Sequence, residues 1–173
     1  MKKICIIIAI LLLLTGCGSA PAMETISDQL LQPVTATLQQ VVADFPRDAS
    51  VEVLQNTEYG KLYLCDGYTI SVQTMASGDL KKTLKTLTGC DEDALTVIKT
   101  RQDECKRYEC VWTASGEGEM QVGRACILDD GAYHYAITVM AGESLAGELT
   151  QTWESLFDSF RLIGADVDLN TGS

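Results

Sequence analysis

The residues of this sequence that could carry chemistry are few, and none lies in a familiar catalytic motif. The single histidine, His134, lies between Tyr133 and Tyr135 in a segment with the pattern of a β-strand. A lone histidine can act as a general base, but neither Gly-x-Ser-x-Gly nor His-Glu-x-x-His is present. We therefore interpret His134 as a strand-surface or satisfied, partly buried side chain.

Two other patterns resemble functional motifs and are better explained as structure. Gly116-Glu117-Gly118-Glu119 lacks the strand-to-helix context of a phosphate-binding loop and indicates a hairpin turn. Glu117 and Glu119 could suggest the paired carboxylates of a glycosidase, but they fall in this exposed turn. Trp112 and Trp153 each belong to an apolar pattern, so we expect both in the core.

Cysteine is the most abundant candidate for chemistry, with seven in the chain. Five lie well beyond the amino terminus, namely Cys65, Cys90, Cys105, Cys110 and Cys126. Outside the cytosol these residues can pair, and because their number is odd at least one stays unpaired or bonds to another molecule. Without a CxxC spacing, and with one histidine, the sequence predicts neither a zinc site nor another cofactor.

One cysteine pair is placed close together by the expected strands. If the turn between the strands Lys106–Ala114 and Met120–Leu128 centres near Gly118, Cys110 and Cys126 lie opposite each other. A disulfide requires Cβ atoms about 3.5–4.5 Å apart. We therefore predict a bridge between Cys110 and Cys126, subject to that distance.

The amino terminus has the pattern of an export signal. Met1-Lys2-Lys3 precedes an apolar run, Ile4–Leu14, that is short of the roughly 20 residues a membrane-spanning helix needs, so a cleavable signal is favoured. The following Leu14-Thr15-Gly16-Cys17 resembles the lipobox of bacterial lipoproteins. The resemblance implies a diacylglyceryl group on the Cys17 thiol and cleavage just before that residue. Two or more acyl chains would anchor the protein stably to a membrane.

The chain is expected to have four parts: a signal peptide (1–16), a lipidated tether (17–25), a single α+β domain (26–163) and a flexible tail (164–173). Cleavage removes two lysines and no acidic residue, so the net charge falls from −11 to −13. Nucleic acid would repel so acidic a chain, and we do not expect it as a partner. The location expected is extracytoplasmic, on the cell membrane or, since Gly18 does not favour inner-membrane retention, on an outer membrane if there is one.

Apolar spacing predicts three helices. Ile26–Phe45 has apolar residues three and four apart, with Pro33 either kinking the helix or beginning a new one. A second helix opens at Ser77-Gly78-Asp79 and ends at Gly89, and its lysines are interpreted as a solvated face. The third is Ser144–Phe160, with Ser144 as its N-cap.

Strand signals alternate with turn signals along the remaining sequence. The expected strands are Val51–Leu54, Lys61–Cys65, Tyr68–Met75, Leu95–Gln102, Lys106–Ala114, Met120–Leu128 and Ala132–Met140, with an extended end at Arg161–Ile163. Asp66-Gly67 predicts a tight hairpin in which both residues have positive φ. These elements predict an α+β fold in which an antiparallel sheet of about six or seven strands is flanked by helices.

The second half of the chain also resembles a known superfamily. The segment Asp130–Ile137 and the helix end Leu156–Leu162 are similar to the carboxyl-terminal half of the PsbP/Mog1/DcrB-like proteins. The resemblance covers Val51–Ile163 and implies an α-β-α sandwich around an antiparallel sheet. A cystatin-like or other α+β fold is the alternative. The superfamily supplies no shared catalytic residues, and fold similarity does not give function.

Three functions compete. The leading hypothesis is a non-enzymatic envelope lipoprotein, held at the membrane through lipid on Cys17, that binds a partner protein or assists an assembly. The second is a carrier that holds a small ligand between sheet and helix. The third is a thiol-based enzyme, for which Cys105 beside Lys106 and Arg107 is the candidate, since neighbouring cations lower a thiol pKa.

Overall fold

The computed structural model of the protein describes residues 36–57, 60–116 and 118–164. The strands are β1 (Gln40–Val42), β2 (Ser50–Thr57), β3 (Gly60–Leu64), β4 (Tyr68–Ala76), β5 (Thr96–Gln102), β6 (Cys105–Ser115), β7 (Met120–Asp129), β8 (Tyr133–Gly142) and β9 (Arg161–Ile163). The helices are α2 (Leu80–Thr88), the 3-10 helix η2 (Glu92–Ala94), α3 (Glu143–Ala146) and α4 (Thr150–Ser159). None of these helices is long and apolar enough to cross a membrane.

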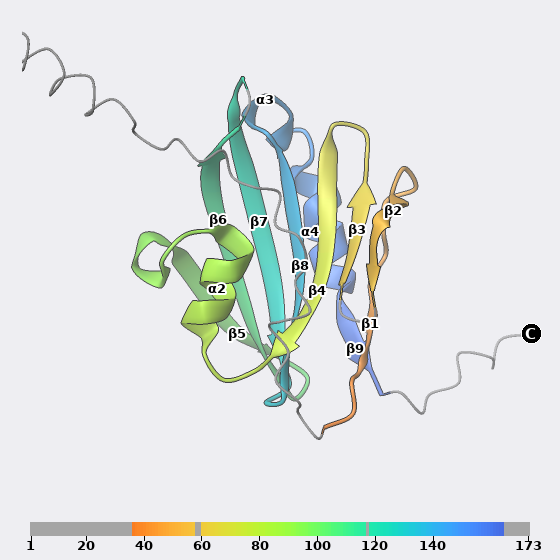
Figure 1. Cartoon of the computed structure of the whole chain (residues 1–173), viewed down its shortest axis with the longest axis vertical. Helices are drawn as coiled ribbons and strands as arrows, with labels where there is room; N and C mark the ends of the chain where they lie inside the picture. Colours follow the sequence, from red (N-terminus) through yellow and green to blue (C-terminus); the bar gives the residue numbers. More distant parts are fainter. Residues whose placement is uncertain (1–35, 58–59, 117, 165–173) are drawn as a thin grey trace, which may run out of the picture.

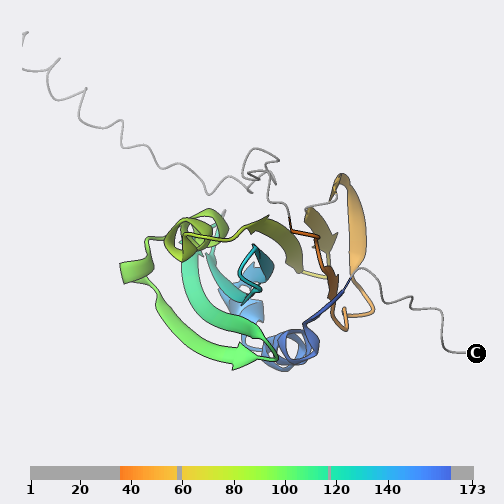
Figure 2. The same ribbon diagram turned by 90° about the horizontal axis from the view of Figure 1, so that it is seen from below.

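Seven of the strands form one curved antiparallel sheet in the order β2-β3-β4-β8-β7-β6-β5 (Figures 1 and 2). Successive hairpins connect β2, β3 and β4, and further hairpins connect β5, β6, β7 and β8. The pairing of β4 with β8 joins these two groups into one sheet. The short strands β1 and β9 form a separate antiparallel pair. The predicted α+β fold with an antiparallel sheet of about six or seven strands is confirmed.

Both faces of the central sheet are buried, which gives the expected α-β-α layering. Along β7, Ala125 and Ile127 belong to the core on the α2 side, whereas Cys126 and Leu128 belong to the core on the α4 side. A strand buried on both faces reads as a continuous apolar run. The α4-side core includes Trp153, Leu156, Phe157 and Phe160, and the α2-side core includes Leu84, Leu87 and Trp112. The two tryptophans are core residues, as predicted.

Local signals fix α2 as the sequence predicts. The Asp79 side chain accepts a hydrogen bond from Lys81 N at 3.0 Å, and Gly89 ends the helix with a φ of 72°. A left-handed residue at that position favours glycine, which has no Cβ to clash. Leu84 and Leu87 face the sheet, so the helix presents its lysines to solvent.

The predicted helix over Ile26–Phe45 is wrong for the part of it that the structure describes. Residues 40–42 form β1, in which Val41 pairs with Leu162 of β9. Leu38, Val41 and Phe45 still pack against the core, and the Phe45 ring stacks on Tyr63 at 4.5 Å. Apolar residues three and four apart therefore also fit an irregular extended segment. Residues 26–35 lie outside the described part.

The predicted helix Ser144–Phe160 is two helices, α3 and α4, with Gly147 between them. Ser144 is not the N-cap, because Gly142 holds that position. A carboxylate from the turn before β7 does the capping: Glu119 Oε2 accepts from Ser144 N at 3.3 Å. A Cβ on Gly142 would overlap this carboxylate, so the glycine makes room for the cap.

The Asp66-Gly67 hairpin is present, with a different backbone from the one predicted. Cys65 N donates to Tyr68 O at 3.0 Å across the turn. Of the two turn residues only Gly67 has a positive φ, at 80°. A single glycine is therefore enough to reverse the direction of the chain. Asp48 supports this turn from outside, since its Oδ2 accepts from Asp66 N at 3.1 Å.

Candidate functional site

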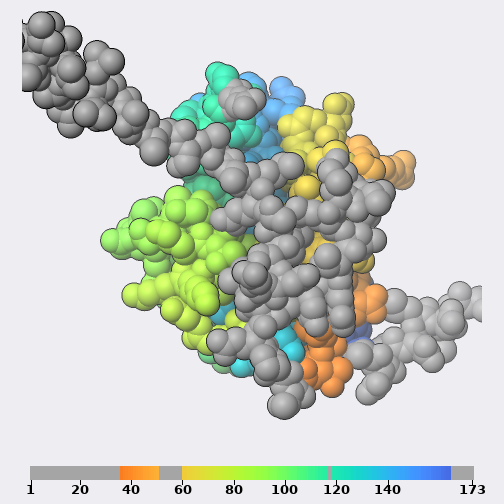
Figure 3. Space-filling view, viewed as in Figure 1, coloured from red at the N-terminus to blue at the C-terminus, as the bar shows by residue number. Residues whose placement is uncertain are grey.

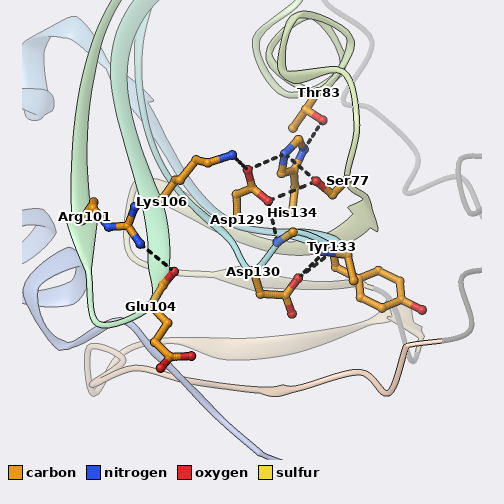
Figure 4. A network of polar contacts seen from close by, with 11 residues as sticks. Ser77, Thr83, Arg101, Glu104, Lys106, Asp129, Asp130, Tyr133 and His134 are labelled. Carbon is orange, nitrogen blue, oxygen red and sulfur yellow. Dashed lines mark hydrogen bonds and ion pairs between the residues drawn. The ribbon is translucent and has the colours of Figure 1, made fainter.

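A cluster of polar side chains joins the beginning of α2 to the β7–β8 hairpin (Figure 4). It consists of Ser77, Thr83, Lys106, Asp129 and His134. Asp129 and His134 are buried, with exposed fractions of 6% and 2%. Of the two alternatives for His134, a strand-surface or a satisfied, partly buried side chain, the structure agrees with the second, and the side chain is fully buried. We name these five residues the His134 cluster.

The hydrogen bonds of the cluster converge on the histidine ring and on one carboxylate. His134 Nδ1 lies 2.7 Å from Thr83 Oγ1, and Nε2 lies 3.4 Å from Ser77 Oγ and 3.7 Å from Asp129 Oδ2. Asp129 Oδ1 accepts from Ser77 Oγ at 3.0 Å and from Gly131 N at 2.8 Å. The ammonium of Lys106 lies 3.5 Å from Asp129 Oδ2.

The cluster has the residue types of a Ser-His-Asp triad but not its connectivity. In a triad, one ring nitrogen faces the serine and the other faces the carboxylate. Here Ser77 and Asp129 both lie on the Nε2 side, and Thr83 occupies Nδ1. Because the Ser77 hydroxyl donates to the carboxylate, the ring does not activate it as a nucleophile. The arrangement ties α2 to the sheet.

Burial and charge set the protonation states within the cluster. Burial lowers the pKa of His134, and the nearby Asp129 carboxylate only partly opposes this effect. Burial disfavours the charged form of Asp129, yet hydrogen bonds from Gly131 and Ser77, with the charges of His134 and Lys106, hold its pKa below the ordinary value. At neutral pH the cluster therefore pairs an ionised carboxylate with a neutral imidazole.

Sequence reasoning identified His134 but none of its partners as members of a site. Ser77 lies 57 residues from His134 in the chain, and Thr83 lies 51 residues away. No local signal could have brought them together, because the contacts depend on how α2 packs against β8.

The predicted disulfide is absent, since Cys110 and Cys126 are both free thiols. In the β6–β7 pairing Cys110 lies opposite Ala125, and Cys126 lies opposite Glu109. The register differs by one residue from the one expected, and such a shift moves a side chain to the other face of a sheet. Cys110 accordingly points to the α2 side and Cys126 to the α4 side. Burial raises the pKa of Cys110 to about 11 and of Cys126 to about 12.

Cys105 does not have the surroundings of a reactive thiol. It opens onto a cavity of about 250 Å³ that acidic side chains also line. Burial raises its pKa, and the charges of Asp130, Asp103 and other acids raise it further. The guanidinium of Arg107 turns away and donates to Phe157 O at 3.0 Å. A low-pKa thiolate requires the opposite electrostatics, so these surroundings do not favour the hypothesis of a reactive Cys105.

A larger hollow of about 580 Å³ lies between α2, η2 and β5. Leu95 and Val97 form part of its lining, and charged side chains form the rest. Glu92 lies 3.4 Å from Lys81 and 3.8 Å from Lys99, which links the helix to the strand. Small-ligand sites are mostly apolar and enclosing, so this charged hollow does not favour the carrier hypothesis.

Exposed apolar side chains gather on β5 and β6, on the face of the sheet opposite to this hollow. Ile98 is 60% exposed and Val111 is 53% exposed, and they are diagonal neighbours because Ile98 lies opposite Glu109. Thr96 and Thr113 are also exposed on these strands. Exposed apolar groups that lie together mark interaction surfaces more often than isolated ones do. We name Thr96, Ile98, Val111 and Thr113 the β5–β6 surface.

The remaining candidate residues from the sequence do not belong to the His134 cluster or to the β5–β6 surface. Glu119 caps α3, and Glu117 and Cys17 lie outside the described residues. Within the described ranges, no group of three or more His, Cys, Asp or Glu side chains is arranged to hold a metal ion.

Comparison with known proteins identifies the fold. No protein-family model matches the sequence, and no curated protein matches it significantly. The cyanobacterial PsbP protein CyanoP from Synechocystis is similar in structure, with a TM-score of 0.53 and 11% identity over 85% of this chain and 99% of that one. A Bacteroides thetaiotaomicron protein gives 0.51 and 10% identity, over 73% of this chain and 46% of that one, so this chain spans about half its length.

The yeast Ran-binding protein Mog1p gives a TM-score of 0.48 and 11% identity over 75% of this chain and 97% of that one. The α+β architecture is similar to that of the cyanobacterial PsbP protein, as the sequence resemblance implied. At these identities the similarity defines the fold alone.

Proposed function

We propose that this protein is a lipid-anchored, extracytoplasmic accessory protein that binds another protein and catalyses no reaction itself. The anchor is assigned to Cys17, on the strength of the lipobox Leu14-Thr15-Gly16-Cys17 and the short apolar run before it. The tether and the folded part then lie outside the cytosol, with an acidic surface that keeps the protein soluble there.

The assignment as non-catalytic is supported by how the candidate residues are used. The histidine, aspartate and serine of the His134 cluster bond to one another and to α2. The pKa of the Cys105 thiol is raised, so the thiolate form is scarce at neutral pH. Residues that could react are thus held in protonation states and hydrogen bonds that stabilise the fold.

The observation that carries the assignment of protein binding is the β5–β6 surface. Ile98 and Val111 are the two most exposed large apolar side chains among the described residues, and they lie on neighbouring strands. Burying them against a partner would remove apolar area from water at a gain of about 25 cal/mol per Å². Their position at the end of the sheet leaves room for a partner.

The anchor is tested by growing cells with an alkyne-bearing fatty acid and detecting the label on the protein. We expect labelling of the wild-type chain and loss of the label in Cys17→Ala. An unlabelled wild-type chain that keeps residues 1–16 would overturn the assignment of the anchor.

Partner binding is tested by chemical crosslinking in intact cells, followed by detection of adducts of the tagged protein. We expect a discrete adduct with another protein, and we expect Ile98→Asp to remove it while Leu64→Asp does not. Leu64 is the matched control, since it is exposed but lies on β3. A chain that stays monomeric in cells would contradict the proposal.

A further inference from the structure

The outer edge of β5 is open. In the strand order of the large sheet β5 is the last member, and no described strand pairs with its other side. Along an antiparallel pair, alternate residues point their N–H and C=O groups away from the neighbouring strand. The seven residues of β5 thus present a row of backbone donors and acceptors to an incoming strand.

The two sides of β5 differ in chemistry. Val97 lies opposite Cys110 and packs on the α2-side core, which places the alternating residues Lys99 and Arg101 on that side as well. Ile98 lies on the other side, where Gln102 donates to Phe160 O at the end of α4. The strand has two cations and no acid, so it is basic on the α2 side and uncharged on the α4 side.

We propose that β5 binds an extended segment of a partner protein by strand addition, and that acidic residues alternate with apolar ones in that segment. Carboxylates of the segment lie beside Lys99 and Arg101, and its apolar side chains lie beside Ile98. This inference rests on the proposed protein-binding function, to which it adds the surface and the chemistry of the partner.

The protein already places a carboxylate of its own beside this row of cations. Glu92 of η2 lies 3.8 Å from Lys99 and 3.4 Å from Lys81, and these lysines are 59% and 74% exposed. Exposed ion pairs of this kind are weak, so a partner carboxylate can replace Glu92. The flank formed by α2 and the segment leading to β5 stands out from the molecule (green, Figure 3).

Charge also argues for an acidic segment at this edge rather than a second copy of the chain. A symmetric antiparallel pair of β5 strands centred on Lys99, the middle of the strand, would place Lys99 opposite Lys99 and Val97 opposite Arg101. Like charges directly opposite each other destabilise a strand pair.

The test places a photo-crosslinking amino acid at position 98 of the full-length protein in intact cells, with position 64 as the control. Crosslinked peptides are then sequenced by mass spectrometry. We expect position 98 to capture a partner segment in which acidic and apolar residues alternate, and position 64 to capture none. The charge-reversed variant Lys99→Glu should lower the yield at position 98 about tenfold, whereas the matched variant Lys61→Glu should leave it unchanged.

The outcomes separate the inference from the proposed function. Partner peptides captured at position 64 but not at 98 would overturn the β5 inference and leave protein binding in place. No protein adduct at any position would overturn both. Crosslinks at position 98 to a second copy, to lipid, or to a segment without acidic residues would each overturn the inference. An unchanged thermal unfolding midpoint in Lys99→Glu would establish that its effect is not a loss of folding.

Discussion

The His134 cluster and the β5 edge are built in opposite ways. In the cluster, every ionisable group is buried or paired, and its hydrogen bonds connect residues more than 50 positions apart in the chain. On β5, most side chains are exposed, and the outer backbone groups have no partner strand among the described residues. The polar groups of the first region hold the fold together, whereas the outer backbone groups of the second have no described strand to pair with.

The comparison shows that residue type alone is a poor guide to function in this chain. Ser77, Asp129 and His134 include the residue types of a hydrolase, yet their connectivity makes them a structural tie. The β5 segment consists of ordinary strand residues, and no motif in its sequence marks it as a binding site. Exposure and position in the sheet, which only the structure supplies, single it out.

The largest effect on stability is expected when the buried carboxylate of Asp129 is removed. Asp129→Ala leaves the Ser77 hydroxyl and the Gly131 N–H without their acceptor and should lower the free energy of unfolding by about 3 kcal/mol. Denaturant unfolding measures this change. The control Glu154→Ala, at an exposed position of α4, should stay within about 0.5 kcal/mol of the wild type. Equal effects of the two substitutions would show that the cluster is not a structural tie.

Acid should weaken the same cluster in two stages. The pKa of His134 is lowered from 6.5, so the unfolded chain binds the proton more readily and stability falls as the pH drops below that value. The pKa of Asp129 is also lowered, from 3.8, so its stabilising contribution is lost only at lower pH still. Unfolding measured between about pH 7 and 5 should show the first stage. His134→Gln should flatten that part of the profile, and an unchanged slope would refute the role of His134.

A smaller loss of stability is expected when Ser77 is replaced. Ser77→Ala removes one hydrogen bond to Asp129 and the contact with His134, and should cost about 1 kcal/mol in the free energy of unfolding. Capture of the partner at position 98 should not change, because Ser77 is no nucleophile in this account. If Ser77→Ala abolished a hydrolytic activity of the purified protein, the structural interpretation of the cluster would fail.

The smallest effect on stability is expected at β5. Ile98→Thr keeps a β-branched strand residue at an exposed position and should change the free energy of unfolding by less than about 0.5 kcal/mol. It should nevertheless reduce binding of the partner, since the apolar contact is lost. A loss of stability comparable to that of Asp129→Ala would mean that Ile98 belongs to the core rather than to a binding surface.

Local signals predicted those elements that depend on local contacts. Asp79 and Gly89 marked the ends of α2, and β-branched and aromatic residues between turn signals marked the strands of the large sheet. The predicted disulfide failed because the β6–β7 register differs by one residue, which no local signal fixes. The segment around Val41 failed for a similar reason, since it becomes a strand only by pairing with β9.

The polar sites were even less predictable. The pairing of His134 with Thr83 and Ser77 needs the whole β4–α2 connection to fold back over β8. The basic residues beside Cys105 suggested a reactive thiol, yet Arg107 bonds to the end of α4, while Asp103 and Asp130 lie near the sulfur. Lys106 is next to Cys105 in the sequence but points to the opposite face of the strand, where it pairs with Asp129, because successive side chains of a strand alternate in direction.

The central claim, that β5 is an open edge that accepts an acidic strand, is tested most directly by hydrogen–deuterium exchange of the lipidated protein in detergent. The exchange of residues 96–102 is measured with and without a short peptide in which glutamate and valine alternate. We predict slower exchange of β5 with this peptide, and no change with its lysine–valine counterpart. If saturating glutamate–valine peptide leaves the exchange of β5 unchanged, or if both peptides protect it equally, the account is contradicted.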